Sequence, residues 1–129
     1  MATTLLVGPD VDLGAGILRA LDAAKFPVTV ALWLLKEDEG EWTLVLGTPL
    51  YDKDPDEAYG RLGSALRPEG YYLGLLPIRI EGHRHPLIAG LRKTFGNAAS
   101  VEGMRLGKHS IRGVWIDDAY VYRIKALHG

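Results

Sequence analysis

The segment that most constrains the fold is the run from Val28 to Leu35, VTVALWLL, which is apolar at both alternating sets of positions. Successive side chains of a strand point to opposite faces of its sheet, so a half-exposed strand would alternate apolar with polar residues. A strand that is apolar on both faces is typical of the middle of a sheet. We therefore expect this segment to be a central strand in a sheet that is covered on two sides.

A second strand and three helices can be placed around this segment. The run from Trp42 to Thr48 follows the acidic turn Glu37–Glu41 and predicts a hairpin with the central strand. Each predicted helix begins at a residue suited to capping its first turn and ends near a proline or glycine. The helices open at Asp10, Asp54 and His85-Pro86, and they close before Pro27, Pro68 and Gly96-Asn97.

The remaining segments read as strands. Residues 73–80 are extended, but Pro77 lacks a backbone donor, so this strand belongs at a sheet edge or is split. Three short strands are predicted at 104–106, 111–116 and 120–124, with Asp117-Asp118 as a tight turn between the last two. The order αββαβαβββ predicts an α+β fold: an antiparallel or mixed sheet of about five to six strands covered by three helices. The length fits a single globular domain over residues 1–129.

Composition narrows the class of protein. The chain has no cysteine, which excludes disulfides and thiolate metal sites and fits a reducing cytosol. No apolar run approaches the roughly 20 residues of a membrane-spanning helix. The segment Met1–Gly8 has no basic leader of the kind that begins a signal peptide. We expect a cytoplasmic protein that does not enter a membrane.

Acidic and basic residues are sorted into opposite halves of the sequence. Residues 1–57 contain four basic and eleven acidic side chains, whereas residues 58–129 contain eleven basic and five acidic ones. If this sorting carries over to the surface, it favours an anionic partner on one face. The alternative is that the fold interleaves the two halves and cancels the field.

Two parts of the chain resemble a known group of proteins. The closing segment SIRGVWIDDAYVYRI, residues 110–124, is similar to the end of a family of small, uncharacterised bacterial proteins. The hairpin ALWLL…EWTLVLGTPLYD, residues 31–52, resembles the middle of the same family. The resemblance implies a compact bacterial domain, and it assigns no catalytic residue because no activity is known for that family.

Two clusters are candidate catalytic or metal-binding sites. His83 and His85, with His109, could bind zinc or copper, but a spacing of two is not that of a helical ligand pair, so solvated loop histidines are favoured. Asp117 and Asp118 could hold magnesium in a phosphodiester-cleaving enzyme, although adjacent aspartates also suit a tight turn. We expect no catalytic residue, no resident metal and no cofactor, and we lean against an enzyme.

The C-terminal segment mixes basic with aromatic side chains. Arginine and lysine neutralise phosphates, and exposed aromatic rings stack on bases, so such a sheet could hold single-stranded nucleic acid. The alternative is that tyrosine and tryptophan are good strand formers and that half of these side chains point inward. The candidate nucleic-acid-binding residues are Arg105, Lys108, Arg112, Trp115, Tyr120, Arg123 and Lys125.

The favoured function is a non-enzymatic protein-interaction or self-associating module. The chain holds more aromatic surface than one small core needs, and tyrosine and tryptophan are enriched at protein interfaces. The partner is expected to be another protein or a second copy of the chain, with nucleic acid as the alternative. The aromatic residues behind this hypothesis are Trp33, Trp42, Trp115, Tyr71 and Tyr72.

Overall fold

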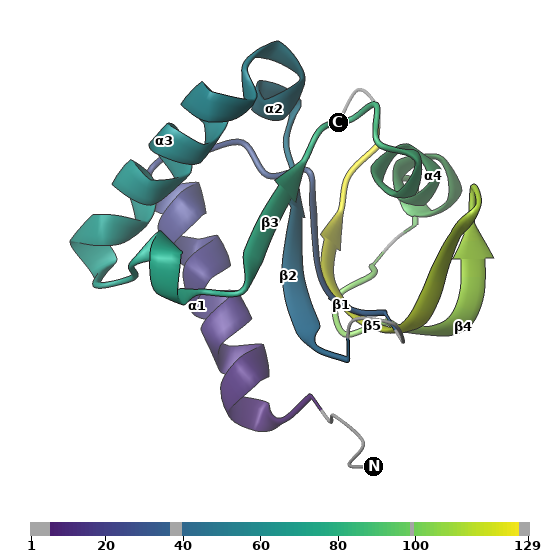
Figure 1. The fold of residues 1–129 in the computed structure, drawn as a ribbon. Helices are drawn as coiled ribbons and strands as arrows, with labels where there is room; N and C mark the ends of the chain where they lie inside the picture. The colour runs from purple at the N-terminus through teal and green to yellow at the C-terminus, as the bar shows by residue number, and fades with distance from the viewer. Residues whose placement is uncertain (1–5, 37–39, 99, 127–129) are drawn as a thin grey trace.

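The protein folds into one five-stranded mixed sheet between two layers of helices (Figure 1). The structure is a computed structural model that describes residues 6–36, 40–98 and 100–126. The strand order is β3-β2-β1-β5-β4, in which β2 and β3 are parallel and the other neighbours are antiparallel. The predicted α+β class is confirmed. The elements are α1 (Gly8–Ala23), β1 (Val30–Leu35), β2 (Trp42–Gly47), α2 (Pro49–Lys53), α3 (Pro55–Leu66), two 3₁₀ turns η1 (Arg67–Glu69) and η2 (Leu73–Leu75), β3 (Ile78–Glu81), α4 (Pro86–Phe95), β4 (Arg105–Ile111) and β5 (Val114–Ile124).

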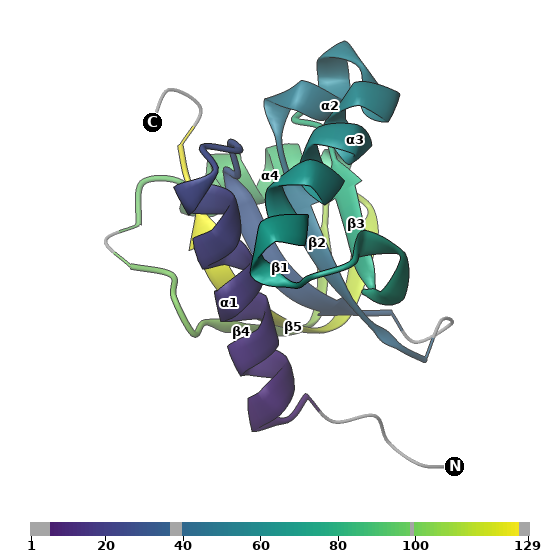
Figure 2. The ribbon, with the colours of Figure 1, turned by 90° about the vertical axis from the view of Figure 1, so that its left-hand side faces the viewer.

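The central strand β1 is covered on both faces, as its sequence predicts. Figure 2 shows α1 and α3 in front of the sheet, and α4 lies behind it. Ala31 and Trp33 belong to the core under α1 and α3, whereas Leu32 and Leu34 belong to the core under α4. The hairpin with β2 is also confirmed, although its turn residues 37–39 lie outside the described part of the chain.

Helix α1 is held on the sheet by hydrogen bonds from two aromatic side chains. Trp33 Nε1 donates to the carbonyl of Asp10 at 3.1 Å and to Tyr122 Oη at 2.9 Å, and Tyr122 Oη donates to the carbonyl of Val11 at 2.6 Å. Burial raises the pKa of Tyr122 to about 12, so this hydroxyl keeps its proton. A Cβ on Gly14 would collide with the Tyr122 hydroxyl, which explains a glycine inside this helix.

The starts of the helices match the sequence in part. Asp54 caps α3 as predicted, since its Oδ1 accepts the backbone N–H groups of Asp56 at 3.1 Å and Glu57 at 3.2 Å. Asp10 is not the N-cap of α1: the helix begins two residues earlier, and Asp10 accepts the backbone N–H of Val7 at 3.3 Å from its third position. The short helix α2 was missed, although Thr48 caps it by accepting the N–H of Leu50.

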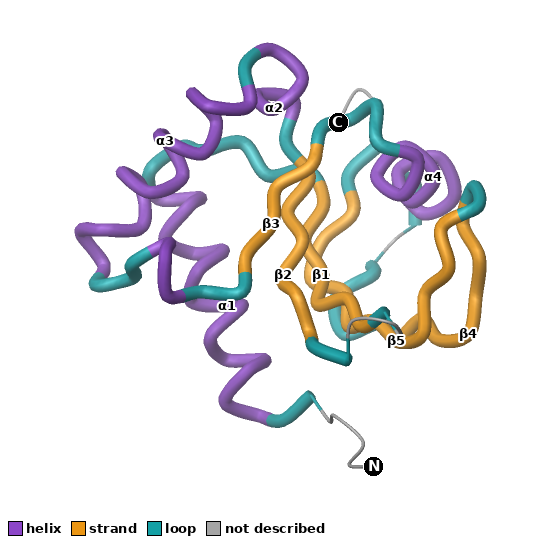
Figure 3. Tube along the Cα trace, viewed as in Figure 1, coloured by secondary structure: helices purple, strands orange, loops and turns teal. Residues whose placement is uncertain are grey.

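The predicted turn at Asp117-Asp118 is wrong. The chain reverses at Arg112-Gly113, whose φ angles of 49° and 82° are both left-handed, as a two-residue hairpin turn requires. Three predicted strands are therefore two, and both aspartates lie inside β5 (Figure 3). The expectation for Pro77 is confirmed, because β3 starts directly after it and occupies the edge of the sheet.

Helix α1 ends in a strained cap. The backbone N–H of Phe26 bonds to the carbonyl of Leu21 at 2.9 Å, and that of Lys25 bonds to the carbonyl of Asp22 at 3.0 Å. This pair of bonds is a Schellman motif, in which the residue past the cap is usually glycine. Lys25 occupies that position with φ 60°. A side chain with a Cβ is disfavoured there by roughly 1–2 kcal/mol.

Replacing Lys25 with glycine is therefore expected to raise the free energy of unfolding by about 1 kcal/mol, because the left-handed strain is removed. Urea denaturation measures this change. Lys25→Ala is the matched control: it removes the same ammonium group but keeps a Cβ, and it should give no such gain. A loss of stability in Lys25→Gly would contradict the strain.

Candidate interaction sites

The candidate nucleic-acid-binding residues are spread along the whole β4–β5 hairpin. Arg105 and Tyr120 are direct cross-strand neighbours, whereas Trp115 pairs with Ser110 near the turn. Arg123 stands eight residues beyond Trp115 on β5, roughly 26 Å away at the rise of an extended strand. Arg112 sits in the turn, and Lys125 follows the end of β5. The structure therefore gathers part of the set on the hairpin and separates the rest.

Two of these basic side chains, Arg105 and Lys108, face carboxylates of β5. Arg105 pairs with Asp118 at 2.6 Å, and Lys108 lies 3.7 Å from Asp117. The two aspartates weighed as a magnesium site are thus partners of cations. Phosphates would have to compete with these carboxylates for both side chains.

The Arg123 side chain is bonded to other segments of the fold. Its guanidinium pairs with Asp22 of α1 and donates to the carbonyl of Val28 at 3.1 Å. The hydrogen bond from Arg123 lowers the pKa of the Asp22 carboxyl. The Tyr120 side chain is also in contact with the fold, because its ring lies edge-on to that of Tyr122 in the core under α1.

Trp115 is the exposed aromatic member of the set, with 49% of its surface accessible to solvent. It lies on the outer hairpin, two positions after the turn glycine. An exposed indole can stack on a base or fill a pocket in a protein partner. It is the aromatic residue of this set that the structure leaves exposed for such a contact.

The three histidines in the described part of the chain, His83, His85 and His109, do not form a metal-binding cluster. His85 caps α4, where its Nδ1 accepts the N–H of Leu87 at 3.2 Å, and His109 is exposed on β4. Within residues 6–36, 40–98 and 100–126, no group of three or more metal-ligating side chains is close enough to hold an ion. His83 was predicted to be a solvated loop residue, but it is half-buried and bonded to two other side chains.

His83 belongs to a polar network around Arg92, which is only 5% exposed. Arg92 Nη1 donates to His83 Nδ1 at 2.7 Å, since a guanidinium has no acceptor. The proton of the neutral ring is then on Nε2, which donates to Thr29 Oγ1 at 2.7 Å. Thr29 Oγ1 in turn donates to the carbonyl of Gly47 at 3.2 Å. The hydrogen-bond partners therefore determine which atom carries the proton at each step of this network.

This arrangement gives the network a structural role. His83 Nε2 donates to Thr29, so it is not free to take a proton from that hydroxyl as a general base would. Arg92 also donates to the carbonyls of Lys125 at 3.1 Å and Ala126 at 2.7 Å, which ties the end of β5 to α4. Sequence reasoning missed this site. Its one signal in the sequence is Arg92, an arginine on the side of α4 that otherwise carries apolar residues.

A groove lies on the outer side of α3. It has a volume of about 350 Å³, and its floor includes the α3 glycines Gly60 and Gly63. The segment that follows η1 forms its other wall. The residues that line it are Tyr59, Gly60, Gly63, Arg67, Tyr71, Tyr72, Leu73 and Gly74, and we call it the α3 groove.

Two exposed apolar side chains belong to the chain segment that lines the α3 groove or directly follows it. Tyr72 is 59% exposed and Leu75 is 84% exposed, which is the highest value among the exposed large hydrophobic residues of the described chain. Tyr71, by contrast, turns inward, where its hydroxyl lies against Gly16 of α1. Water contact with the side chains of Tyr72 and Leu75 is unfavourable, and a partner that covers them would remove it.

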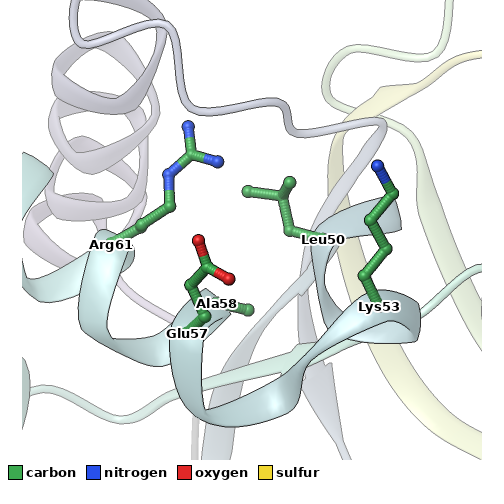
Figure 4. A pocket seen from close by; sticks show the side chains of 5 residues that line it. All are labelled: Leu50, Lys53, Glu57, Ala58 and Arg61. Carbon is green, nitrogen blue, oxygen red and sulfur yellow. The ribbon is translucent and has the colours of Figure 1, made fainter.

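A smaller pocket of about 250 Å³ lies where α2 meets α3 (Figure 4). Lys53 and Arg61 stand on opposite sides of Leu50, and the carboxylate of Glu57 points toward the space between them. The anionic side chain offsets part of the field of the two cations and leaves one net positive charge around the pocket.

The His83 network makes stability dependent on pH. Burial, and then the nearby Arg92 charge, lowers the pKa of His83 below 6.5, while Asp52 opposes this shift. Below pH about 6.5 the unfolded chain binds a proton that the folded ring resists, so stability is full above this pH and falls as the pH decreases.

We expect His83→Gln to lower the free energy of unfolding by about 1–3 kcal/mol at neutral pH, because it breaks buried hydrogen bonds. The gap between wild type and variant should narrow as the pH is lowered through 6 toward 5. Urea denaturation of both proteins across this range measures the gap, in which contributions from other groups cancel. If the difference in free energy of unfolding widens on acidification, folding raises the affinity of the His83 ring for a proton, which contradicts the expectation.

Among the described residues, no helix combines the length and apolar character needed to cross a membrane. Searches of protein-family models, of curated proteins and of solved structures found no match for this chain. The resemblance to small bacterial proteins therefore stays a prediction.

Proposed function

We propose that this chain is a small cytoplasmic protein-interaction module without catalytic activity, and that it binds its partner through the α3 groove. The observation that carries this proposal is the exposure of Tyr72 and Leu75 beside a preformed groove. Burying one large apolar side chain contributes roughly 1.5–3 kcal/mol. Tyrosine and arginine, here Tyr72 and Arg67, are also the residue types that recur at the centre of protein interfaces.

The buried tryptophans narrow the choice of surface. Trp33 and Trp42 are 2% and 9% exposed, so both contribute to the core rather than to a contact surface. Of the five aromatic residues behind the interaction hypothesis, Tyr72 and Trp115 are the two with exposed side chains. Of these two, Tyr72 lines the α3 groove, and a second exposed apolar side chain, Leu75, follows it by three residues.

The wall of the α3 groove is held in shape by its own backbone. The N–H of Tyr71 bonds to the carbonyl of Leu66 at 3.2 Å, and the N–H of Leu75 bonds to that of Tyr72 at 2.9 Å. Gly70 between them has a φ of 84°, which a residue with a Cβ would adopt at a cost. A wall that is already ordered loses little conformational entropy on binding.

The free edge of β4 is a weaker candidate for a protein contact. An exposed edge strand can pair with a strand of another chain. In β4, however, Lys108 has a left-handed φ of 47° and follows Gly107, which distorts the edge. A charged, distorted edge is how proteins resist such pairing.

A photo-crosslinking test distinguishes these surfaces. A benzophenone amino acid at Tyr72 should form covalent adducts with a protein partner when illuminated in the cells that make the chain. The same group at Trp115 is the matched control, since that position is exposed but distant in sequence from the α3 groove. Adduct masses identify each partner. Adducts at Trp115 alone, or at neither position, would overturn the proposal.

Nucleic-acid binding is the second candidate, favoured by the exposed Trp115 near Arg112 on the outer hairpin. In a fluorescence-anisotropy titration with single-stranded DNA and RNA, binding should weaken steeply as salt rises. Arg112→Gln should reduce the salt slope by about one unit, whereas Lys93→Gln on α4 should leave it unchanged. Absence of binding by the wild type at low salt would end this alternative.

A further inference from the structure

We propose that the partner in the α3 groove is a second copy of this chain, bound with the two α3 helices antiparallel across a two-fold axis. This inference rests on the proposed function, to which it adds the identity of the partner. Three observations carry it: the charge pattern of α3, its close-packing centre, and the apolar side chains beside it.

The outward face of α3 carries one narrow stripe. Asp56, Gly60, Gly63 and Arg67 follow one another at helical spacing, so they lie above one another along the helix. Arg67 continues the helical backbone, with φ −58° and ψ −43°. The opposite face holds the buried residues Ala58, Leu62 and Leu66. The stripe is therefore directed away from the core.

The stripe is complementary to itself when reversed. Asp56 lies as far before the midpoint between Gly60 and Gly63 as Arg67, the C-cap of α3, lies after it. A two-fold axis makes the same patch meet itself in reverse. It would bring Asp56 of one copy to Arg67 of the other, twice, with glycine facing glycine between them.

Neither charge has an ion-pair partner within the described part of its own chain, and both side chains are exposed. At the centre, a Cβ on Gly60 would meet no atom, and one on Gly63 only Leu73 at 3.8 Å. The two backbones can thus approach closely. The net charge of −1 adds little repulsion between copies.

The apolar side chains complete the contact. Tyr72 lines the α3 groove opposite the α3 glycines, and the exposed Leu75 ends the adjoining turn η2. In a two-fold arrangement each copy presents both these side chains and the α3 groove. The apolar side chains and the groove that would receive them then lie on one self-complementary patch. Association would bury on both copies the apolar area that the monomer exposes.

Sedimentation velocity over a range from micromolar to near-millimolar protein tests the dimer. The wild type should shift from monomer to dimer as concentration rises. Asp56→Arg alone and Arg67→Asp alone should each weaken association by at least about tenfold, because each places like charges opposite one another. An equimolar mixture of the two variants should dimerise again, since both pairs are restored in the mixed dimer.

Rescue in the mixture separates a broken contact from a protein that fails to fold, and a thermal melt of each variant confirms folding. Leu75→Ser should also weaken the dimer, whereas Trp115→Ser, which removes an exposed aromatic side chain elsewhere, should not. A wild type that stays monomeric throughout, or a mixture without rescue, overturns the antiparallel dimer. If Tyr72 still crosslinks to a different protein, the proposed function stands and only this inference fails.

Discussion

The structure depends on the burial of β1 from both sides. Because every second side chain of this strand enters a different core, neither layer of helices can be removed without exposing it to water. The strand pairs with β2 on one edge and β5 on the other, so it also organises the hydrogen bonding of the sheet. The positions of α1, α3 and α4 follow from the need to cover its two faces.

Each helical layer is further fixed by polar groups that are buried or half-buried. On one side Trp33 and Tyr122 bond to carbonyls of α1, and on the other Arg92 and His83 bond to Thr29 and to the end of β5. Such groups are destabilising when unpaired, so they allow few alternative arrangements. Hydrophobic burial sets the layers, and these bonds set how each layer is aligned on the sheet.

The charge sorting of the sequence does not become a simple division of the fold. Strands β1 and β2 come from the acidic half, and the sheet places strands of the basic half on both sides of them. Arg123 of the basic half pairs with Asp22 of the acidic half, and Arg105 pairs with Asp118 within its own half. Charge is instead organised locally, as on α3, where Asp56 and Glu57 lie in the first turn and Arg67 is the C-cap.

The sequence by itself determined the central strand, the β1–β2 hairpin, the cap at Asp54 and the edge position after Pro77. Each of these depends on periodicity, or on the chemistry of one residue and its near neighbours, and such signals are local. Tertiary structure decided the rest. Asp117-Asp118 has the composition of a turn, but the chain reverses at Gly113, which adopts a left-handed φ without strain. This position of the turn lets Ile116 and Ala119 reach the core under α4. The His83–Arg92 network joins four segments distant in sequence, and the α3 groove forms only once the chain after η1 folds back on α3. Contacts across long sequence separations leave no local pattern, so only the folded chain could reveal these sites.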